Sequence, residues 1–130
     1  MNQKTSKIIG IDVGGTKILL QTFDKKLNLI KETKVRTETK KGRKGFVNQL
    51  YELIDWFFSK DVKGIGIAVP GIVDMNKGTL VKAPHLPTGK NLPLRKLIQD
   101  RYKVPVTIDN DINGFLTAEK ETAKLKKYKN

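Results

Sequence analysis

The apolar and polar positions along the chain follow two different periods. Short apolar runs at 7–12, 17–23 and 62–69 are rich in β-branched residues and predict strands, the last of them a central strand. Residues 27–37 alternate between apolar and polar side chains, which predicts a third strand of the leading group with one exposed face. Over 44–59 the apolar side chains recur every three or four residues, which predicts an amphipathic helix.

The second half of the chain continues with shorter elements. Residues 72–81 predict a pair of return strands, and 83–91, with two prolines and one glycine, predict a loop. Residues 92–102 predict a helix, 104–108 a further strand, and 111–127 a terminal helix. Three strands followed by alternating helices and strands predict an α/β fold, with a mixed sheet, a leading three-strand meander and flanking helices.

Length and composition narrow the class of protein. A chain of 130 residues is the size of one domain and can bury a core without disulfides or a structural metal. It contains no cysteine, which excludes disulfide scaffolds, thiolate zinc sites and cysteine nucleophiles. No apolar run reaches the roughly 18 residues of a membrane span, and residues 1–7 do not resemble a signal peptide. We therefore expect a cytoplasmic protein with no membrane partner.

The net charge of the chain is strongly positive. Lys and Arg number 26 against 13 Asp and Glu, for a formal charge of +13. A basic domain indicates nucleic acid or another anionic partner. However, 22 of the 26 are lysines spread over both halves of the chain, and arginine is the side chain that binds phosphate bidentately. A lysine-rich surface is therefore favoured over a nucleic-acid interface.

A glycine pair follows the first predicted strand. Asp12 ends the strand, Gly14 and Gly15 form the turn, and Thr16 and Lys17 lead into the next strand. Glycines let consecutive backbone N–H groups converge on a phosphate, the hydroxyl and ammonium groups can add contacts, and the carboxylate can hold hydrated Mg²⁺. The spacing is equally compatible with a Gly-Gly hairpin turn and a surface lysine.

Residues 64–71 are also rich in glycine but do not match a dinucleotide-binding loop. Their spacing differs from Gly-x-Gly-x-x-Gly, and Pro70 and Gly71 prevent a helix from following directly. Glycines within a central strand more often permit close packing. Gly71, at the end of the strand, can also let the backbone approach a ligand closely.

Asn and Asp side chains gather in 108–114, after the last predicted strand. The spacing resembles an EF-hand loop, but Glu119 follows Gly114 one residue too early and a strand precedes the loop, so we exclude calcium. Ligands bind at the carboxyl ends of strands in open α/β sheets, which makes Asp111 a candidate general base. A helix cap with an Asx turn accounts for the same residues.

The single histidine, His85, lies in a proline-containing segment. One histidine without cysteine does not support a catalytic zinc site. A histidine at the surface of a loop is the simplest expectation, because loops lie on surfaces.

Three segments taken in order resemble a known family. Residues 12–17, 69–74 and 109–113 are similar to motifs in the N-terminal half of the ROK family of sugar kinases and sugar-responsive repressors. The resemblance spans about residues 7–119. It implies the actin-like, ribonuclease H-like ATPase fold and ATP-dependent phosphorylation of a hexose or amino-sugar hydroxyl.

The resemblance also implies a role for the first motif. Asp12, Gly14, Gly15, Thr16 and Lys17 would form a phosphate loop for ATP. Asp12, at the end of the strand, is also the candidate ligand for Mg²⁺.

On the sugar side, the resemblance implies four contacts. Asp111 would be the catalytic base that accepts the proton of the sugar hydroxyl, and it would also touch the sugar. Asn110 and Gly71 would hold sugar hydroxyls. His85 stands where family members often carry Asn followed by Leu or Ile, which places it at the sugar site and leaves the identity of the sugar open.

The resemblance implies that residues 1–130 form a single N-terminal lobe, whose partner is a C-terminal lobe that this chain lacks. Since the active site of this fold lies between two lobes, the isolated chain is expected to be inactive. The resemblance leaves open whether the full-length protein is a homo-oligomer. The alternatives are a sugar-sensing regulatory domain without phosphoryl transfer and, third, a basic nucleic-acid-binding domain on the same fold.

Overall fold

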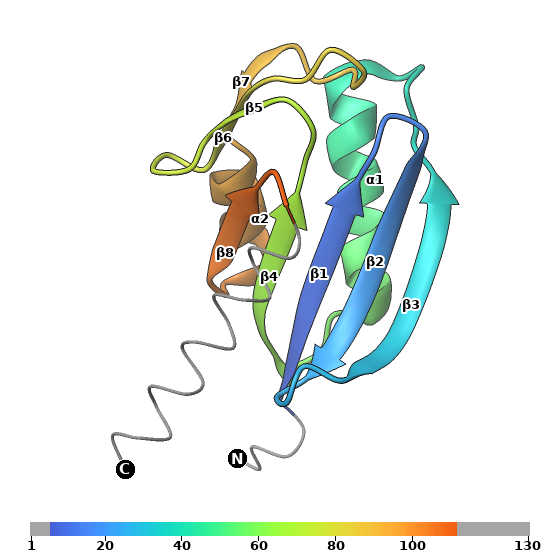
Figure 1. Ribbon diagram of the computed structural model, residues 1–130, viewed down its shortest axis with the longest axis vertical. Coiled ribbons are helices and arrows are strands. Elements are labelled where there is room, and N and C mark those ends of the chain that lie inside the picture. The colour runs from blue at the N-terminus through green and yellow to red at the C-terminus, as the bar shows by residue number, and fades with distance from the viewer. Residues whose placement is uncertain (1–5, 112–130) are drawn as a thin grey trace.

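The computed structural model describes residues 6–111, and the predicted helix at 111–127 therefore lies almost wholly outside the described residues. A five-stranded mixed sheet has the order β3-β2-β1-β4-β8 (Figure 1). Its strands are β1 (Lys7–Val13), β2 (Lys17–Asp24), β3 (Leu29–Arg36), β4 (Val62–Ala68) and β8 (Val106–Asp109). The antiparallel meander β1–β2–β3 is followed by parallel β4 and β8, which confirms the predicted mixed α/β sheet.

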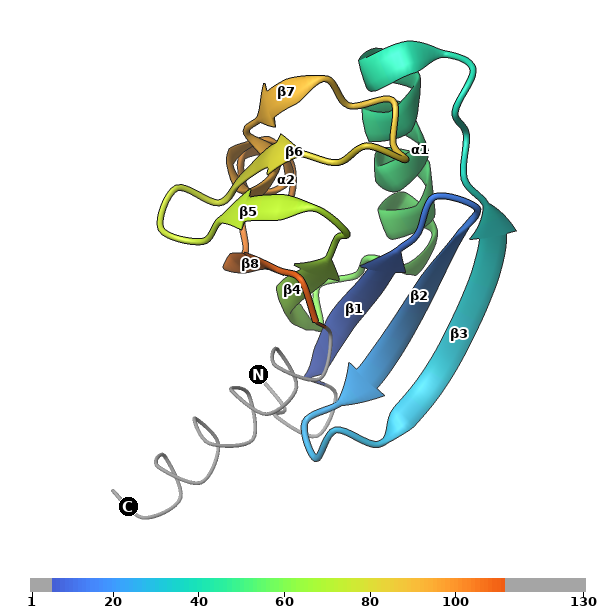
Figure 2. The same ribbon diagram turned by 45° about the horizontal axis from the view of Figure 1, so that its top comes forward.

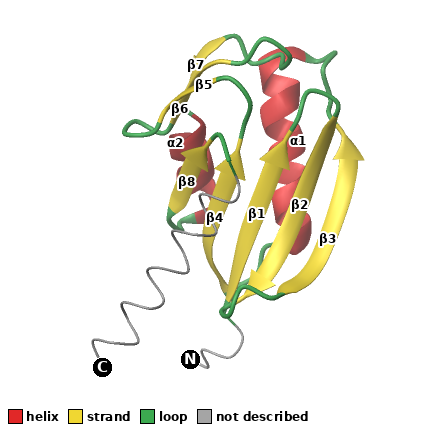
Figure 3. Cartoon of the chain, in the orientation of Figure 1, coloured by secondary structure: helices red, strands yellow, loops and turns green. Residues whose placement is uncertain are grey.

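The helices α1 (Gly42–Phe57) and α2 (Leu94–Tyr102) cover one face of this sheet (Figures 1 and 3). Apolar side chains of α1, among them Phe46, Leu50 and Ile54, are fully buried together with Ile9 and Ile11 of β1. Each such side chain stabilises the fold by roughly 1.5–3 kcal/mol relative to exposure. No helix within 6–111 is long and apolar enough to cross a membrane.

A smaller antiparallel sheet lies beyond the carboxyl ends of β4 and β8 (Figure 2). It consists of β5 (Ile72–Asp74), β6 (Thr79–Lys82) and β7 (Lys90–Leu92). The first two strands confirm the predicted return pair. The predicted loop at 83–91 is wrong in its last two residues, because Lys90 pairs with Lys82 and begins β7. The two paired residues are separated by a loop, and a strand of three residues is too short to show a periodic pattern of apolar and polar side chains.

The helix boundaries also differ slightly from the prediction. α1 begins two residues earlier than expected, at Gly42, and ends at Phe57. α2 begins later than expected, because Leu92 belongs to β7 and Pro93 is the N-cap residue rather than part of the first turn.

An ionic and aromatic cluster joins α1 to α2. The Arg101 guanidinium lies 4.5 Å from the centroid of the Tyr51 ring and donates a hydrogen bond to Asp55 Oδ2 at 2.8 Å. The Tyr102 hydroxyl lies 2.6 Å from Asp55 Oδ1. The hydrogen bonds from Arg101 and Tyr102 lower the pKa of Asp55 below its usual 3.8. The ionised carboxylate therefore favours the folded state.

We expect the contribution of Asp55 to stability to depend on pH. Because its pKa is lower in the folded chain, its stabilisation is complete above the unfolded pKa, near pH 4, and is lost as the pH falls through the lowered folded pKa. Asp55→Asn is therefore expected to lower the melting temperature at pH 6, with a difference from wild type that shrinks towards pH 2. Thermal unfolding followed by circular dichroism at both pH values measures this.

The matched control is Asp100→Asn on α2. The Asp100 carboxylate pairs with exposed Lys96, at 3.1 Å, and exposed pairs of this kind contribute little to stability. A constant difference in melting temperature between Asp55→Asn and wild type from pH 6 to pH 2 would contradict the ionic role of Asp55.

Candidate functional site

The carboxyl ends of three adjacent parallel strands meet at one edge of the main sheet. In the register of the sheet, Asp12 of β1 pairs with Ala68 of β4, and Ala68 pairs with Asp109 of β8. Neighbouring strands lie about 4.8 Å apart, so the Cα atoms of Asp12 and Asp109 are roughly 10 Å from each other. The segments that follow these strand ends contain the residues singled out from the sequence.

The β1–β2 turn is held in place by Thr37. The Gly14 N–H donates to the Lys17 carbonyl at 2.8 Å and closes the turn. Buried Thr37 donates from Oγ1 to the Gly14 carbonyl at 2.7 Å and from its backbone N–H to the Thr16 carbonyl at 2.8 Å. The sequence does not indicate this role of Thr37, because a threonine directly after a strand is its only signal. It orients the turn that precedes Lys17.

Gly14 and Gly15 do not adopt the left-handed conformation. Neither has a positive φ, so the turn is not of the primed Gly-Gly type and the backbone does not form an αR–αL nest. Glycine is required at these two positions because other atoms lie close to where a Cβ would be. A Cβ on Gly14 would lie 3.0 Å from the Lys17 carbonyl oxygen, and one on Gly15 would lie 3.0 Å from Cβ of His85. The groups that this turn offers to an anion are therefore mainly the exposed side chains of Thr16 and Lys17.

His85 packs its backbone and Cβ against the glycine turn and remains exposed to solvent. Gly15, Thr16, Pro70 and His85 line an open cleft of about 430 Å³. The cleft brings together the first motif, the end of β4 and the segment after β6. The single histidine is thus both a surface residue and a lining residue of this cleft.

Gly71 is required by its backbone conformation. Its φ is +107°, and a Cβ there would lie 2.2 Å from the Lys82 carbonyl oxygen and 2.9 Å from Cα of Ala83. The carbonyl of Gly71 accepts a hydrogen bond from Asn110 Nδ2 at 2.8 Å. Gly71 therefore brings the segment after β4 against the end of β6 and links it to the segment after β8.

Asn110 has a structural role that the sequence does not indicate. Its Nδ2 donates to the Val69 carbonyl at 3.1 Å and to the Gly71 carbonyl at 2.8 Å, which uses both amide protons. Its backbone N–H donates to Asp109 Oδ1 at 2.6 Å. Only Oδ1 of the Asn110 side chain is left to contact a ligand, as an acceptor for a hydroxyl group.

The two candidate carboxylates, Asp12 and Asp111, are exposed at this edge. Within residues 6–111, no group of three or more His, Cys, Asp or Glu side chains could hold a metal ion by itself. Mg²⁺ commonly uses one or two carboxylates and completes its shell with water and substrate phosphates. An exposed carboxylate at a strand end fits that role, so Asp12 is compatible with Mg²⁺ bound together with a nucleotide.

Curated proteins resemble this chain over most of its length. It is 32% identical over 126 residues to a xylose repressor from Caldicellulosiruptor bescii, covering 92% of this chain and 31% of the repressor. It is 38% identical over 114 residues to an N-acetyl-D-glucosamine kinase from Citrobacter koseri, covering 85% of this chain and 36% of the kinase. The chain thus spans about a third of the length of these relatives.

Solved structures agree with these similarities. A ROK family glucokinase from Streptomyces griseus in complex with glucose and AMPPNP superposes with a TM-score of 0.71 at 28% identity, over 81% of this chain and 33% of the glucokinase. A ROK hexokinase from Thermus thermophilus gives a TM-score of 0.68 at 28% identity, over 79% of this chain and 34% of the hexokinase. Residues 8–130 match the ROK family. The chain therefore belongs to the ROK family, with the actin-like ATPase fold of its N-terminal region, among relatives that include both sugar kinases and xylose repressors.

Proposed function

We propose that this chain is the N-terminal lobe of an ATP-dependent kinase that phosphorylates a hydroxyl of a hexose or amino sugar. One observation carries the proposal: groups suited to phosphoryl transfer meet at a single edge of the sheet. They are the Asp12 carboxylate at the end of β1, the hydroxyl and ammonium groups of Thr16 and Lys17 around the β1–β2 turn, and a second carboxylate, Asp111, after β8. Phosphoryl transfer needs such groups, because the protein mainly positions the reactants and neutralises charge.

In the proposed reaction, Asp111 accepts the proton of the sugar hydroxyl as its oxygen attacks the γ-phosphorus of ATP. A new P–O bond forms to the sugar, the bond between the γ-phosphorus and the bridging oxygen breaks, and ADP leaves. Lys17 and Thr16 contact the phosphates of ATP. Asp12 would hold Mg²⁺, which would supply positive charge to offset that of the phosphates.

The sugar contacts follow from the groups that remain available. Asn110 offers Oδ1 as a hydrogen-bond acceptor, because its amide protons bind the backbone of the segment after β4. Gly71, which holds the segment after β4 against the end of β6, would contact the sugar through its main chain. Exposed His85 would contact the sugar from the wall of the open cleft. By this arrangement Asn110 both shapes the loop and contacts the sugar.

A chimeric enzyme tests the proposal. The segment of the Citrobacter koseri kinase that aligns with this chain is replaced by this chain, and ADP release is measured with a panel of hexoses and N-acetylhexosamines. We expect sugar-dependent ADP release from the chimera, and none from the 130-residue chain alone, because the chain would contribute only one wall of the site. The unmodified kinase is the positive control.

The second candidate is a regulatory domain that binds sugar without phosphorylating it. The 32% identity to a xylose repressor favours it specifically. A chimera that unfolds cooperatively and binds sugar by calorimetry, yet releases no ADP with any sugar of the panel, would contradict the kinase proposal and support the regulator.

A further inference from the structure

The outer edge of β3 is unpaired within the described part of the chain, since β3 is the first strand of the sheet and pairs only with β2. The hydrogen-bond pattern shows which of its backbone groups face outward. The Thr37 N–H donates inward to the Thr16 carbonyl of the β1–β2 turn. Since backbone groups alternate in direction along a strand, those of Thr33 also face inward, and those of Glu32 and Lys34 face outward.

Hydrogen bonds at the end of β3 agree with this assignment of inward and outward backbone groups. The side-chain amide of Gln49 on α1 donates from Nε2 to the Arg36 carbonyl and accepts from the Glu38 N–H, both at 2.8 Å. This amide occupies the place that a neighbouring strand would take. It satisfies the outward Arg36 carbonyl and the N–H of Glu38 just beyond β3. No strand among residues 6–111 pairs with the outward groups of Glu32 and Lys34.

We infer that a second copy of this chain pairs with β3 along this edge, antiparallel and centred on Thr33. In that register Glu32 of each copy lies opposite Lys34 of the other. Because the backbone groups of both residues face outward, these are hydrogen-bonded pairs, and the two of them supply four backbone hydrogen bonds across the two-fold axis.

Charge complementarity selects this register over its neighbours. A shift that centres the pairing on Glu32 places Glu32 opposite its own copy. A shift that centres it on Lys34 places Lys34 opposite its own copy. Like charges directly opposite are destabilising, whereas opposite charges stabilise a cross-strand pair. Charged side chains on an edge strand prevent unspecific pairing. The Thr33-centred register makes two of them, Glu32 and Lys34, complementary.

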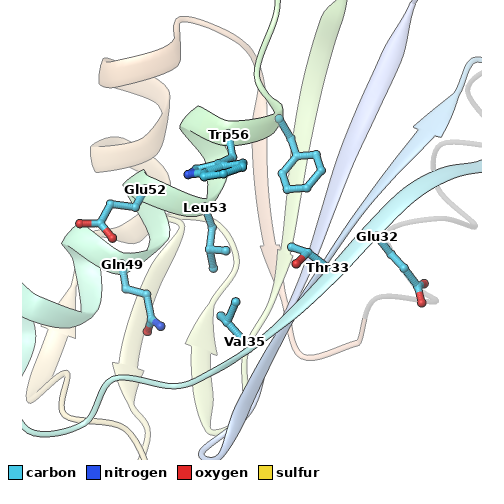
Figure 4. Close-up of a pocket in the computed structure, with 8 residues that line it drawn as sticks. Glu32, Thr33, Val35, Gln49, Glu52, Leu53 and Trp56 are labelled. Atoms are coloured by element: carbon cyan, nitrogen blue, oxygen red, sulfur yellow. The ribbon is translucent and has the colours of Figure 1, made fainter.

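A groove lies beside β3, at the edge that the second copy would cover. It lies between β3 and α1, has a volume of about 430 Å³, and is lined by Thr33, Val35, Leu53 and Trp56 among others (Figure 4). Trp56 is 85% exposed. The proposed pairing puts Lys31 of the second copy opposite Val35, on the groove face of the sheet, where its aliphatic stem and ammonium group can pack against Trp56.

A cysteine cross-link tests the position of the axis. Thr33 meets its own copy in a non-hydrogen-bonded pair, where Cα atoms are about 4.5 Å apart, within the range of a disulfide. Since the native chain has no cysteine, Thr33→Cys is expected to form a covalent dimer with oxidised glutathione. Lys31→Cys is the matched control on the same strand face. Its two copies would lie roughly 13 Å apart, four residues along the strand, and should not cross-link.

A charge exchange tests the register. Sedimentation equilibrium of the wild-type chain is expected to show a monomer–dimer equilibrium, with a blue shift of the single tryptophan, Trp56, as the dimer forms. Glu32→Lys and Lys34→Glu should each weaken dimerisation by about tenfold, because both pairs become like-charged. The double variant restores opposite pairs and should restore the affinity. A purely structural effect of either substitution would not be rescued in this way.

Three results would overturn the inference. They are a wild-type chain that stays monomeric at all concentrations, a dimer in which Thr33→Cys cross-links no better than Lys31→Cys, and a double variant that dimerises no better than the single ones. None of these results bears on sugar phosphorylation, which is tested by ADP release in the chimera.

Discussion

Replacing Asp111 by asparagine in the chimeric kinase is expected to lower kcat by about 10²–10⁴-fold, the usual effect of losing a catalytic base. Asparagine keeps the size of the side chain and can still hydrogen-bond the sugar, but it cannot accept the hydroxyl proton. The KM for the sugar should therefore change much less than kcat. Steady-state ADP release over a range of sugar concentrations separates the two constants.

The control for this prediction is Asp100→Asn in the same chimera. It is also a carboxylate-to-amide change, but Asp100 lies on α2 in an exposed pair with Lys96. Its kcat should equal that of the unsubstituted chimera. If Asp111→Asn retained full kcat, the assignment of Asp111 as the base would be wrong, while sugar-dependent turnover by the chimera would still support the kinase.

Gly71→Ala is expected to destabilise the chain by about 3 kcal/mol or more. Two effects add: a positive φ of +107° is strained for alanine, and the new methyl group would lie 2.2 Å from the Lys82 carbonyl oxygen. The main chain of β6 cannot move aside without breaking its pairing with β5 and β7. Because small domains are stable by only about 5–15 kcal/mol, the loss should be evident in urea unfolding monitored by circular dichroism.

Gly64→Ala provides the matched comparison. Gly64 lies in β4 without a positive φ, and a Cβ there would meet only the Pro105 carbonyl oxygen, at an ordinary contact distance of 3.7 Å. The same substitution should therefore change the free energy of unfolding far less than Gly71→Ala does. Equal destabilisation by the two variants would show that the backbone conformation of Gly71 is not the cause.

Much of the fold could be predicted from local patterns. The apolar runs of β1, β2 and β4 and the helical period of α1 are properties of neighbouring residues, so they appear in the sequence as they do in the structure. The three-residue strand β7 could not be predicted in this way. It exists because Lys90 and Leu92 pair with β6, and such pairing leaves no local period.

Part of the candidate site could likewise be predicted from the sequence, and part could not. The motifs were recognisable because glycines and carboxylates follow predicted strands. The roles of Thr37 and Asn110 were not, since each acts through hydrogen bonds to residues more than twenty positions away. The reason for glycine at position 15 was likewise hidden, because it depends on His85, which lies far along the chain.

The sequence by itself determined the order of the described elements apart from β7, the mixed α/β class and the placement of chemical groups directly after strands. These follow from side-chain period and composition, which act over a few residues. Only the tertiary structure decided that the ends of β1, β4 and β8 share one edge, that Asn110 donates its amide protons to the backbone, and that β3 lies at the edge of the sheet. Each of these depends on which distant segments pair, and the register of that pairing is set by packing of the whole core.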